Sequence, residues 1–427
     1  MADINIAKAP PNYVVLPFYG TGALFFLVLA VMMLFTPGEW GGHYFTPHLL
    51  AMTHTAALGW GSMIIFGSAY QLLPVICESD LFSSKMALAS YGCLTVGAGL
   101  LIASFWLFTP GWMMITGGAL VVTAAGIYGV NAYLTMGSCK RYSVQKLFIL
   151  ASAGWLLVTT LAGLLLAINL YEPFIFRSHL DMLKLHAHAG LAGWFRQLIT
   201  GVSSKLVPIF LLGKSGKIRL LYGSFVCQNA GLVLFLADGL VFGFTPRIFF
   251  YEGLIVLGVV AWLIWLFDCY RNRVRKAIDL PMRHVFFSCL CLLIALLLPP
   301  ALYYSHDHVW ALVYGLFLFQ GWITFLILGM TFKTLPFIVW NYRYKHLSGK
   351  IKVPMPKHLY HEKWLRYQLG IHTASLLLLV AGVALRQEAL IRTGIWIALA
   401  TAALYVGNVV TVMFYKIKTP ADATVHR

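Results

Sequence analysis

Charged residues are scarce in this chain. They make up 11% of its 427 residues, and only 14 residues are Asp or Glu, whereas apolar residues make up 60% and the mean hydropathy is +0.80. A soluble enzyme with one large core needs a more charged surface than this composition supplies. The composition therefore excludes that class and predicts an all-α, polytopic membrane protein.

Three other features are missing. There is no CxxCH motif, which excludes covalent attachment of haem. No small-residue cleavage site follows the first apolar stretch, so we expect a retained helix and not a removed signal peptide. No ladder of Asp or Glu accompanies the basic loops, so proton pumping is not predicted. The seven cysteines are scattered, and we expect buried, inert thiols; Cys289 and Cys291 point to nearly opposite sides of one helix.

Long apolar stretches recur about twelve times. A bilayer core of about 30 Å needs about 20 mostly apolar residues per helix, and each stretch meets this length. The predicted helices cover residues 14–35, 48–76, 86–108, 111–135, 146–170, 180–212, 217–240, 247–268, 282–304, 308–338, 363–386 and 390–416. We expect one integral membrane domain over residues 1–427.

The formal charge of +17 lies almost entirely in alternate loops. These loops cover residues 140–146, 214–219, 271–283 and 343–357. The positive-inside rule places them, and both termini, in the cytoplasm. The basic charge therefore predicts a membrane orientation, and nucleic-acid binding is disfavoured.

One spacing occurs three times along the chain. Relative to a Gly-Trp pair, a His stands five residues before, a second Gly eight after, a polar residue twelve after and a Pro fifteen after. The copies are His54, Gly59, Trp60, Gly67, Gln71 and Pro74; His188, Gly193, Trp194, Gly201, Lys205 and Pro208; and Gly321, Trp322, Gly329, Lys333 and Pro336, with Leu316 in place of the histidine. Copies 134 and 128 residues apart predict three pseudo-symmetric four-helix repeats, at about 14–135, 146–268 and 282–416.

Polar residues inside the predicted helices are few. Ionisable groups there cost about 2.5–3.5 kcal/mol and usually face the bundle interior. Arg196 lies near the centre of its helix, so we expect it to meet water, a carboxylate or an anionic group on a cofactor. The amides at mid-membrane either have a functional role or form interhelical hydrogen bonds. These amides are Gln197, Gln228, Asn229, Gln320 and Asn408.

Three histidines have matched depth. His54, His186 and His188 lie two to three turns from the predicted outer face, where a neutral imidazole is suited to bind iron or copper. His186 and His188 are about 200° apart around their helix, so they face different neighbours. The alternative is a hydrogen bond from each ring to a carbonyl of an adjacent helix. His306, His308 and His372 are weaker metal candidates.

The amino-acid sequences of two segments resemble those of a known protein family. His54-Thr55 followed by GWGSMIIFGSAYQLLP is similar to the second helix of nitric oxide reductases and C-family terminal oxidases, where that histidine binds a low-spin haem. HAHAGLAGW at 186–194 is similar to the H-x-H-x-G-x-x-G-W segment that these oxidases carry on helix ten. The chain thus resembles a divergent subunit I of the haem-copper oxidase superfamily.

This resemblance implies a redox protein that binds haem. The haem would be b-type and non-covalent, with His54 and His188 as ligands, His186 beside a second haem or a copper, and Arg196 near the cofactor. Where the family has a histidine pair for copper, helix seven has Cys227-Gln228-Asn229, so the copper site is incomplete. Expected partners are membrane lipids, a cytochrome c or quinol donor, or a respiratory subunit. The expected location is a bacterial inner membrane, and an oxidoreductase activity toward O2 or NO remains open.

Two other functional classes remain open. About twelve helices with a buried Arg196 and His372 are compatible with a solute transporter, although many transporters consist of two six-helix halves and this chain divides into thirds. A non-catalytic scaffold or assembly subunit of a respiratory complex would retain the histidines without using them.

Overall fold

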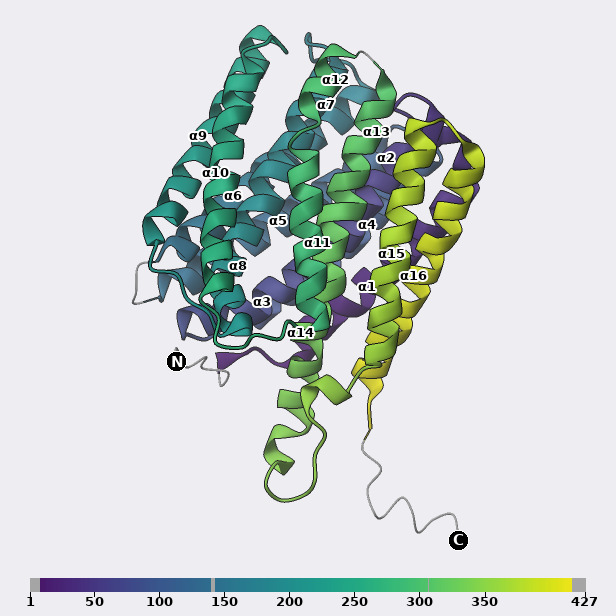
Figure 1. Cartoon of the computed structure of the whole chain (residues 1–427). Coiled ribbons are helices and arrows are strands. Elements are labelled where there is room, and N and C mark those ends of the chain that lie inside the picture. Colours follow the sequence, from purple (N-terminus) through teal and green to yellow (C-terminus); the bar gives the residue numbers. More distant parts are fainter. Residues whose placement is uncertain (1–7, 140–142, 306, 417–427) are drawn as a thin grey trace. The chain divides into compact units, whose positions relative to one another are not determined.

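The computed structural model describes residues 8–139, 143–305 and 307–416, and its regular elements there are helices (Figure 1). Within these residues, eleven helices are long and apolar enough to cross a membrane. This confirms an all-α membrane protein. The one remaining predicted span, over residues 180–212, is also a helix, but its polar residues keep it outside this apolar set. It runs over α7 (His179–His188), η4 (Ala189–Phe195) and α8 (Arg196–Leu211).

The helices begin and end within five residues of the predicted limits. Besides α7, η4 and α8, the helices that form the predicted spans are α1 (Asn12–Phe35), α2 (Pro47–His54), η3 (Thr55–Ser62), α3 (Met63–Cys77), α4 (Ser84–Trp106), α5 (Trp112–Gly137), α6 (Val144–Tyr171), α9 (Ile218–Phe242), α10 (Ile248–Arg271), α11 (Leu280–Ala295), α12 (Pro299–Tyr304), α13 (His308–Leu316), η5 (Phe317–Ile323), α14 (Thr324–Arg343), α15 (Glu362–Ala384) and α16 (Glu388–Phe414). Short polar residues start several of them. Ser83 and Ser143 accept the amide hydrogens of Met86 and Lys146, and this satisfies backbone donors that a helix start leaves without partners.

Three long helices contain a π-helical segment at the same place in the repeat. The segments η3, η4 and η5 begin directly after His54, His188 and Leu316 and include the Gly-Trp pair of each copy. Wider π turns are rare in helices and frequently mark functional sites.

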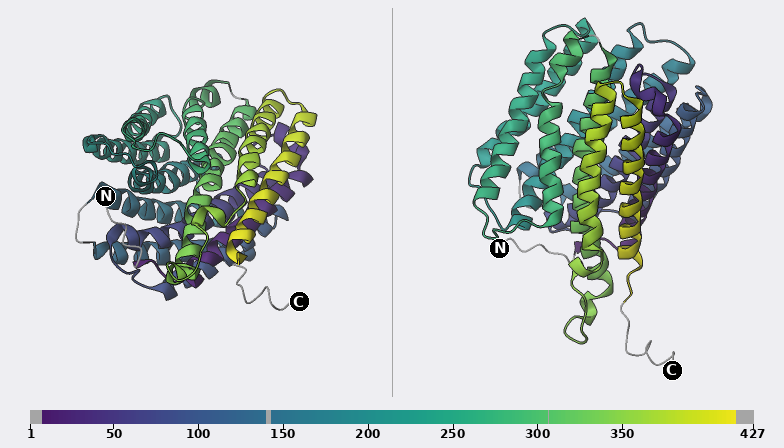
Figure 2. Two further views of the ribbon diagram at one scale, coloured as in Figure 1. Left: turned by 60° about the horizontal axis from the view of Figure 1, so that its bottom comes forward. Right: turned by 45° about the vertical axis from the view of Figure 1, so that its right-hand side comes forward.

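Three hairpins of neighbouring helices pack closely: α4 with α5, α9 with α10, and α15 with α16. The last pair lies side by side in both views of Figure 2. Glycines permit this approach, because a Cβ on Gly97 would lie 2.9 Å from the carbonyl oxygen of Gly117, and a Cβ on Gly231 would lie 2.7 Å from that of Tyr251. A Cβ on Gly382 would likewise lie 2.8 Å from the amide nitrogen of Ile391.

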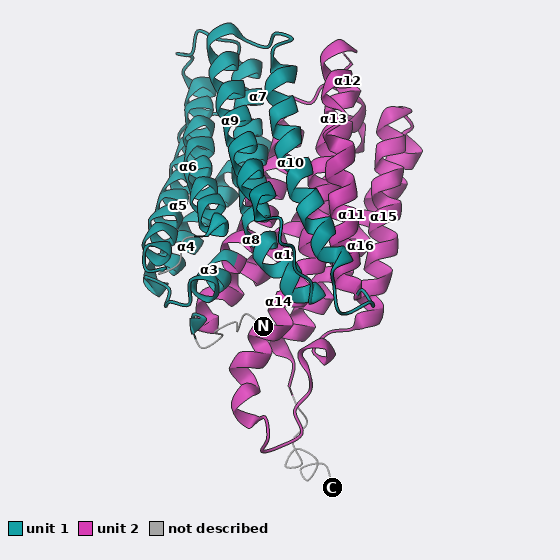
Figure 3. Cartoon of the chain, turned by 60° about the vertical axis from the view of Figure 1, so that its left-hand side comes forward, with its two compact units in different colours: residues 1–10, 69–278 teal, residues 11–68, 279–427 magenta. Residues whose placement is uncertain are grey.

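The chain forms two compact units (Figure 3). Unit 1 comprises residues 1–10 and 69–278, and unit 2 comprises residues 11–68 and 279–427. Unit 1 holds the pairs α4–α5 and α9–α10 together with α6, α7, η4 and α8. Unit 2 holds α1 against α16, and α11 against η5 and α14.

The repeat glycines are contact points between helices. In each copy, Cβ atoms added to the two glycines would collide with residues seven apart on one partner helix, at 2.5–2.8 Å. The pairs are Gly59 with Phe25 and Gly67 with Phe18 on α1, Gly193 with Trp155 and Gly201 with Phe148 on α6, and Gly321 with Cys291 and Gly329 with His284 on α11. A glycine can let either another helix or a flat cofactor come close to the backbone. In the structure, these glycines contact other helices.

A disulfide joins Cys77 at the end of α3 to Cys139 after α5 within unit 1, with Cα atoms 4.8 Å apart. The expectation of inert thiols is therefore wrong for these two cysteines. The other five cysteines are free thiols; Cys269 and Cys291 are buried as expected, and Cys93, Cys227 and Cys289 are half-buried.

This disulfide gives the first testable prediction. It closes a loop with a sequence separation of 62, so Cys77→Ser is expected to lower the free energy of unfolding by about 2–4 kcal/mol under oxidising conditions. Dithiothreitol should lower the stability of the wild type to that of the variant and leave the variant unchanged. Thermal unfolding in detergent, with thiol labelling to count free cysteines, measures both effects. A Cys93→Ser variant is the matched control, and equal sensitivity of all three proteins to dithiothreitol would contradict the prediction.

Candidate histidine sites

His54 ends α2 in unit 2 and is half-buried. Its Nδ1 lies 2.7 Å from the carbonyl oxygen of Leu50, one turn earlier on the same helix. A carbonyl only accepts hydrogen bonds, so Nδ1 is the protonated nitrogen of the neutral ring. The lone pair is then on Nε2, which is the tautomer that metal-binding histidines have when the other nitrogen donates to a carbonyl.

His188 repeats this geometry in unit 1. It ends α7, is half-buried, and donates from Nδ1 to the carbonyl oxygen of Lys184 at 2.7 Å, again one turn earlier. Its ring packs against Phe235 of α9, with centroids 4.9 Å apart. The two repeat histidines therefore share their place before a π segment, their hydrogen bond and their tautomer.

His186 faces a different neighbour, as the 200° separation predicted. Its Nδ1 lies 3.0 Å from the carbonyl oxygen of Thr159 on α6, and its ring fills the space beside Gly163. This is the hydrogen bond to an adjacent helix that formed the alternative interpretation. His54 and His188 make their bonds to their own helices instead.

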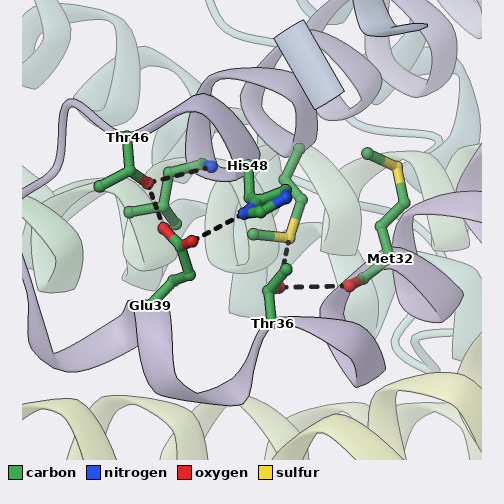
Figure 4. A network of polar contacts seen from close by, with 7 residues as sticks. Met32, Thr36, Glu39, Thr46 and His48 are labelled. Atoms are coloured by element: carbon green, nitrogen blue, oxygen red, sulfur yellow. Dashed lines mark hydrogen bonds and ion pairs between the residues drawn. The ribbon is translucent and has the colours of Figure 1, made fainter. Parts of the chain in front are cut away.

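A polar network fixes the start of the helix that carries His54 (Figure 4). Thr46 caps α2 by accepting the amide hydrogen of Leu49 at 3.4 Å, and its hydroxyl donates to Glu39. The other carboxylate oxygen of Glu39 lies 2.7 Å from Nδ1 of His48. Beside it, the hydroxyl of Thr36 donates to the carbonyl oxygen of Met32 at 3.2 Å. These bonds tie the loop between α1 and α2 to the first turn of α2 and so position His54.

Arg196 follows η4 in unit 1 and is 3% exposed. Its Nε donates to Oε1 of Gln228 on α9 at 3.0 Å, and its Nη2 donates to the carbonyl oxygen of Ala192 at 3.2 Å. Next to it, Asn229 donates to Oε1 of Gln197 at 3.3 Å and accepts from Nε1 of Trp155 at 2.9 Å. The amides of α9 thus form interhelical hydrogen bonds, which was one of the two roles expected for them.

The bond between Arg196 and Gln228 gives a second prediction. Arg196→Met leaves the buried Oε1 of Gln228 without this donor, so it should lower the free energy of unfolding by about 1–3 kcal/mol. Arg196→Met combined with Gln228→Met removes both partners and should recover most of that loss. The free energy of unfolding in detergent is measured for the wild type, for each single variant and for the double variant. Strictly additive effects of the two substitutions would contradict a coupling between Arg196 and Gln228.

Two of the three weaker metal candidates, His308 and His372, lie within the described residues. His306 lies outside the described residues. The ring of His308 contacts that of His43, with centroids 4.1 Å apart, and burial together with His308 lowers the pKa of His43. His372 is buried on α15, where its Nε2 donates to the carbonyl oxygen of Gln320 at 2.8 Å. Within the described residues, no three His, Cys, Asp or Glu side chains gather as a metal site.

Two buried polar residues were missed by the sequence patterns. His284 on α11 and Gln368 on α15 are each 0% exposed. His284 lies 136 residues after Phe148, which itself lies 130 after Phe18, and all three contact the second glycine of their repeat copy. Extending the repeat to the preceding helix would have identified His284. Comparison of the whole chain with protein-family models and with curated proteins finds no match.

Proposed function

We propose that this chain is a haem-binding redox protein of the membrane, related in fold to subunit I of the haem-copper oxidases. One observation carries the proposal: His54 and His188 hold the same tautomer through the same bond, Nδ1 to the carbonyl oxygen four residues earlier, at 2.7 Å in both. Each stands directly before a π segment. Donation from Nδ1 to a carbonyl leaves the lone pair on Nε2, which is the nitrogen that axial ligation of haem iron uses.

The proposed cofactor is non-covalent haem b. Each of the two rings offers Nε2 as a ligand for haem iron, and bound haem would supply one-electron chemistry. The backbone carbonyls of Leu50 and Lys184 orient the rings and increase their basicity as ligands. Phe235 beside His188 excludes water from one face of that ring. The repeat glycines pack against neighbouring helices, so they would not line a bound haem.

Three features support the three-repeat organisation within this proposal. Each copy has a π segment, a pair of glycines packed on one partner helix, and a hairpin joined through glycines. The third copy has Leu316 instead of histidine, so only two copies supply iron ligands. On α9, Gln228 and Asn229 form hydrogen bonds with Arg196, Gln197 and Trp155, which supports an incomplete copper site there.

An absorption spectrum of the detergent-purified protein tests the proposal. Oxidised and dithionite-reduced samples should show a Soret band with sharp α and β bands, and iron should be present in the same sample. Electron transfer from a cytochrome c or a quinol then identifies the donor, and added O2 or NO tests for an oxidoreductase. A folded protein, produced with added haem, that contains no iron would overturn the proposal and favour a transporter or a scaffold subunit.

A further inference from the structure

Two loops of unit 1 lie against each other beside the ends of its helices. Residues 212–217 join α8 to α9, and residues 272–278 follow α10. The amide of Val274 donates to the carbonyl oxygen of Leu212 at 3.0 Å. Gly213 permits this approach, because a Cβ there would collide with the carbonyl oxygen of Cys269. Residues 212–219 and 271–276 thus form one surface, which we call the paired-loop surface.

Leu212 has an unusual backbone conformation at this junction. Its φ is 51°, in the left-handed region that residues with a Cβ rarely adopt. Such a conformation persists where the surrounding structure holds it, and the hydrogen bond from Val274 does so here. Both side chains are apolar, and Leu212 is 48% and Val274 81% exposed. The loops therefore present apolar side chains where they meet.

Asp268, in the last turn of α10, is already engaged by the first loop. One carboxylate oxygen pairs with Nζ of Lys217 at 3.0 Å, and the other accepts the hydroxyl hydrogen of Ser215 at 2.6 Å. Residues 212–219 and 271–276 contain no Asp or Glu, whereas seven of these fourteen residues are Lys or Arg. The paired-loop surface therefore has a large excess of positive charge.

Arg273 fixes the shape of the second loop. Its guanidinium lies over the ring of Tyr270, 3.9 Å from the centroid, and its Nη1 donates to the carbonyl oxygen of Tyr270 at 2.7 Å. Its Nη2 donates to the carbonyl oxygen of Lys276 at 3.2 Å. Most of its donors are thus used within the loop, so Arg273 positions its neighbours and does not itself face a ligand.

Four other cations of this surface are exposed, and no carboxylate within residues 8–139, 143–305 and 307–416 forms an ion pair with them. They are Lys214, Arg219, Arg275 and Lys276. The adjoining helix ends carry exposed apolar side chains, because Ile218 on α9 is 45% and Phe267 on α10 is 58% exposed. The cations therefore lie directly beyond the apolar, lipid-facing part of two spanning helices.

A phospholipid matches this arrangement better than a soluble anion or an acidic protein. Its phosphate requires cationic donors, and its acyl chains require apolar side chains immediately below them; the helix ends and loops supply both. Clusters of 4–8 Lys or Arg directly beyond a spanning helix attract anionic lipids. The positive-inside rule places these loops in the cytoplasm, and the cytoplasmic leaflet is rich in such lipids.

We propose that the paired-loop surface is a binding site for the headgroup of an anionic phospholipid. Lys214, Arg219, Arg275 and Lys276 bind the phosphate, while Leu212 and Val274 enter the boundary with the acyl chains. Arg273 and the bond between Val274 and Leu212 hold the two loops in place. This inference does not rest on the proposed haem, because none of the candidate histidines belongs to these loops.

Titration of the delipidated, full-length protein with phosphatidylglycerol in a neutral detergent, followed by native mass spectrometry, tests the site. The wild type is expected to bind phosphatidylglycerol more tightly than phosphatidylcholine, and inorganic phosphate should not displace it. A basic residue near an anionic lipid contributes about fivefold to affinity, so Arg275→Gln should weaken binding about fivefold. The variant Lys214→Gln/Arg219→Gln/Arg275→Gln/Lys276→Gln should weaken it by at least about 100-fold.

A charge-matched control comes from the basic loop between α14 and α15 in unit 2. Lys345→Gln/Lys350→Gln/Lys352→Gln/Lys357→Gln also removes four exposed cations, and it should leave the affinity of the tightest lipid site unchanged. An equal loss of affinity in the two quadruple variants would show that net charge alone attracts the lipid, and it would overturn the proposal. Displacement of the lipid by inorganic phosphate would overturn it as well.

A pair of single variants tests the built geometry without changing the charge. Arg275→Lys keeps an exposed cation and should bind phosphatidylglycerol as the wild type does. Arg273→Lys loses the stacking on Tyr270 and the fork of hydrogen bonds, so it should weaken binding about fivefold or more by misplacing the neighbouring cations. If the quadruple variant does not fold, this pair still decides, because equal affinity of its two members would contradict a site shaped by the loops.

Discussion

Replacing His188 with alanine is expected to remove most of the bound haem. The variant loses Nε2 as a ligand, together with the hydrogen bond from Nδ1 to Lys184 that orients the ring. Loss of a ligand should weaken haem binding by more than the 10- to 100-fold that removal of a supporting hydrogen bond costs. The measurement is the Soret absorbance per protein chain, with iron determined on the same sample.

His54→Ala is the independent second test of the same idea. His54 and His188 occupy equivalent repeat positions but belong to different units, so a local folding defect in one unit would not explain a loss of haem in both. His179→Ala is the matched control, because it removes a half-buried histidine from α7, the helix that also carries His188. A full Soret band in both His54→Ala and His188→Ala would exclude these residues as haem ligands, even if the wild type contains haem.

The helices could be predicted from the sequence because apolar length sets them. Every limit was within five residues of the structure, including the helix over 179–211. That helix carries Asp181, Lys184, Arg196 and Lys205, and it was nevertheless predicted as one of the long apolar stretches. The π segments were not predicted, because seven or eight residues are too few for the apolar spacing to distinguish a wider π turn from an α turn.

The polar sites were only partly predictable, because the partners of a side chain depend on how the neighbouring helices pack. A histidine at depth is visible in the sequence, and so His54, His186 and His188 were identified. Which atom a ring uses depends on the neighbouring helix, as Thr159 decides for His186. The disulfide of Cys77 with Cys139 depends on the packing of α3 and the end of α5, which spacing alone does not give.

Replacing Gly329 with alanine is expected to lower the free energy of unfolding by about 3 kcal/mol. An added Cβ would lie 2.5 Å from the carbonyl oxygen of Pro281 and 2.7 Å from Cβ of His284. Neither atom is the end of a flexible side chain, so α11 and α14 must move apart to accept the methyl group. Thermal and denaturant unfolding of the purified protein in detergent measure the loss.

Gly315→Ala supplies the matched control on the same long helix. A Cβ there would have nothing within 4 Å, so the substitution should stabilise the protein by about 0.5–1 kcal/mol through helix propensity alone. The contrast in sign separates close packing from propensity. Equal stability of the two variants would show that the repeat glycines do not hold these helices together.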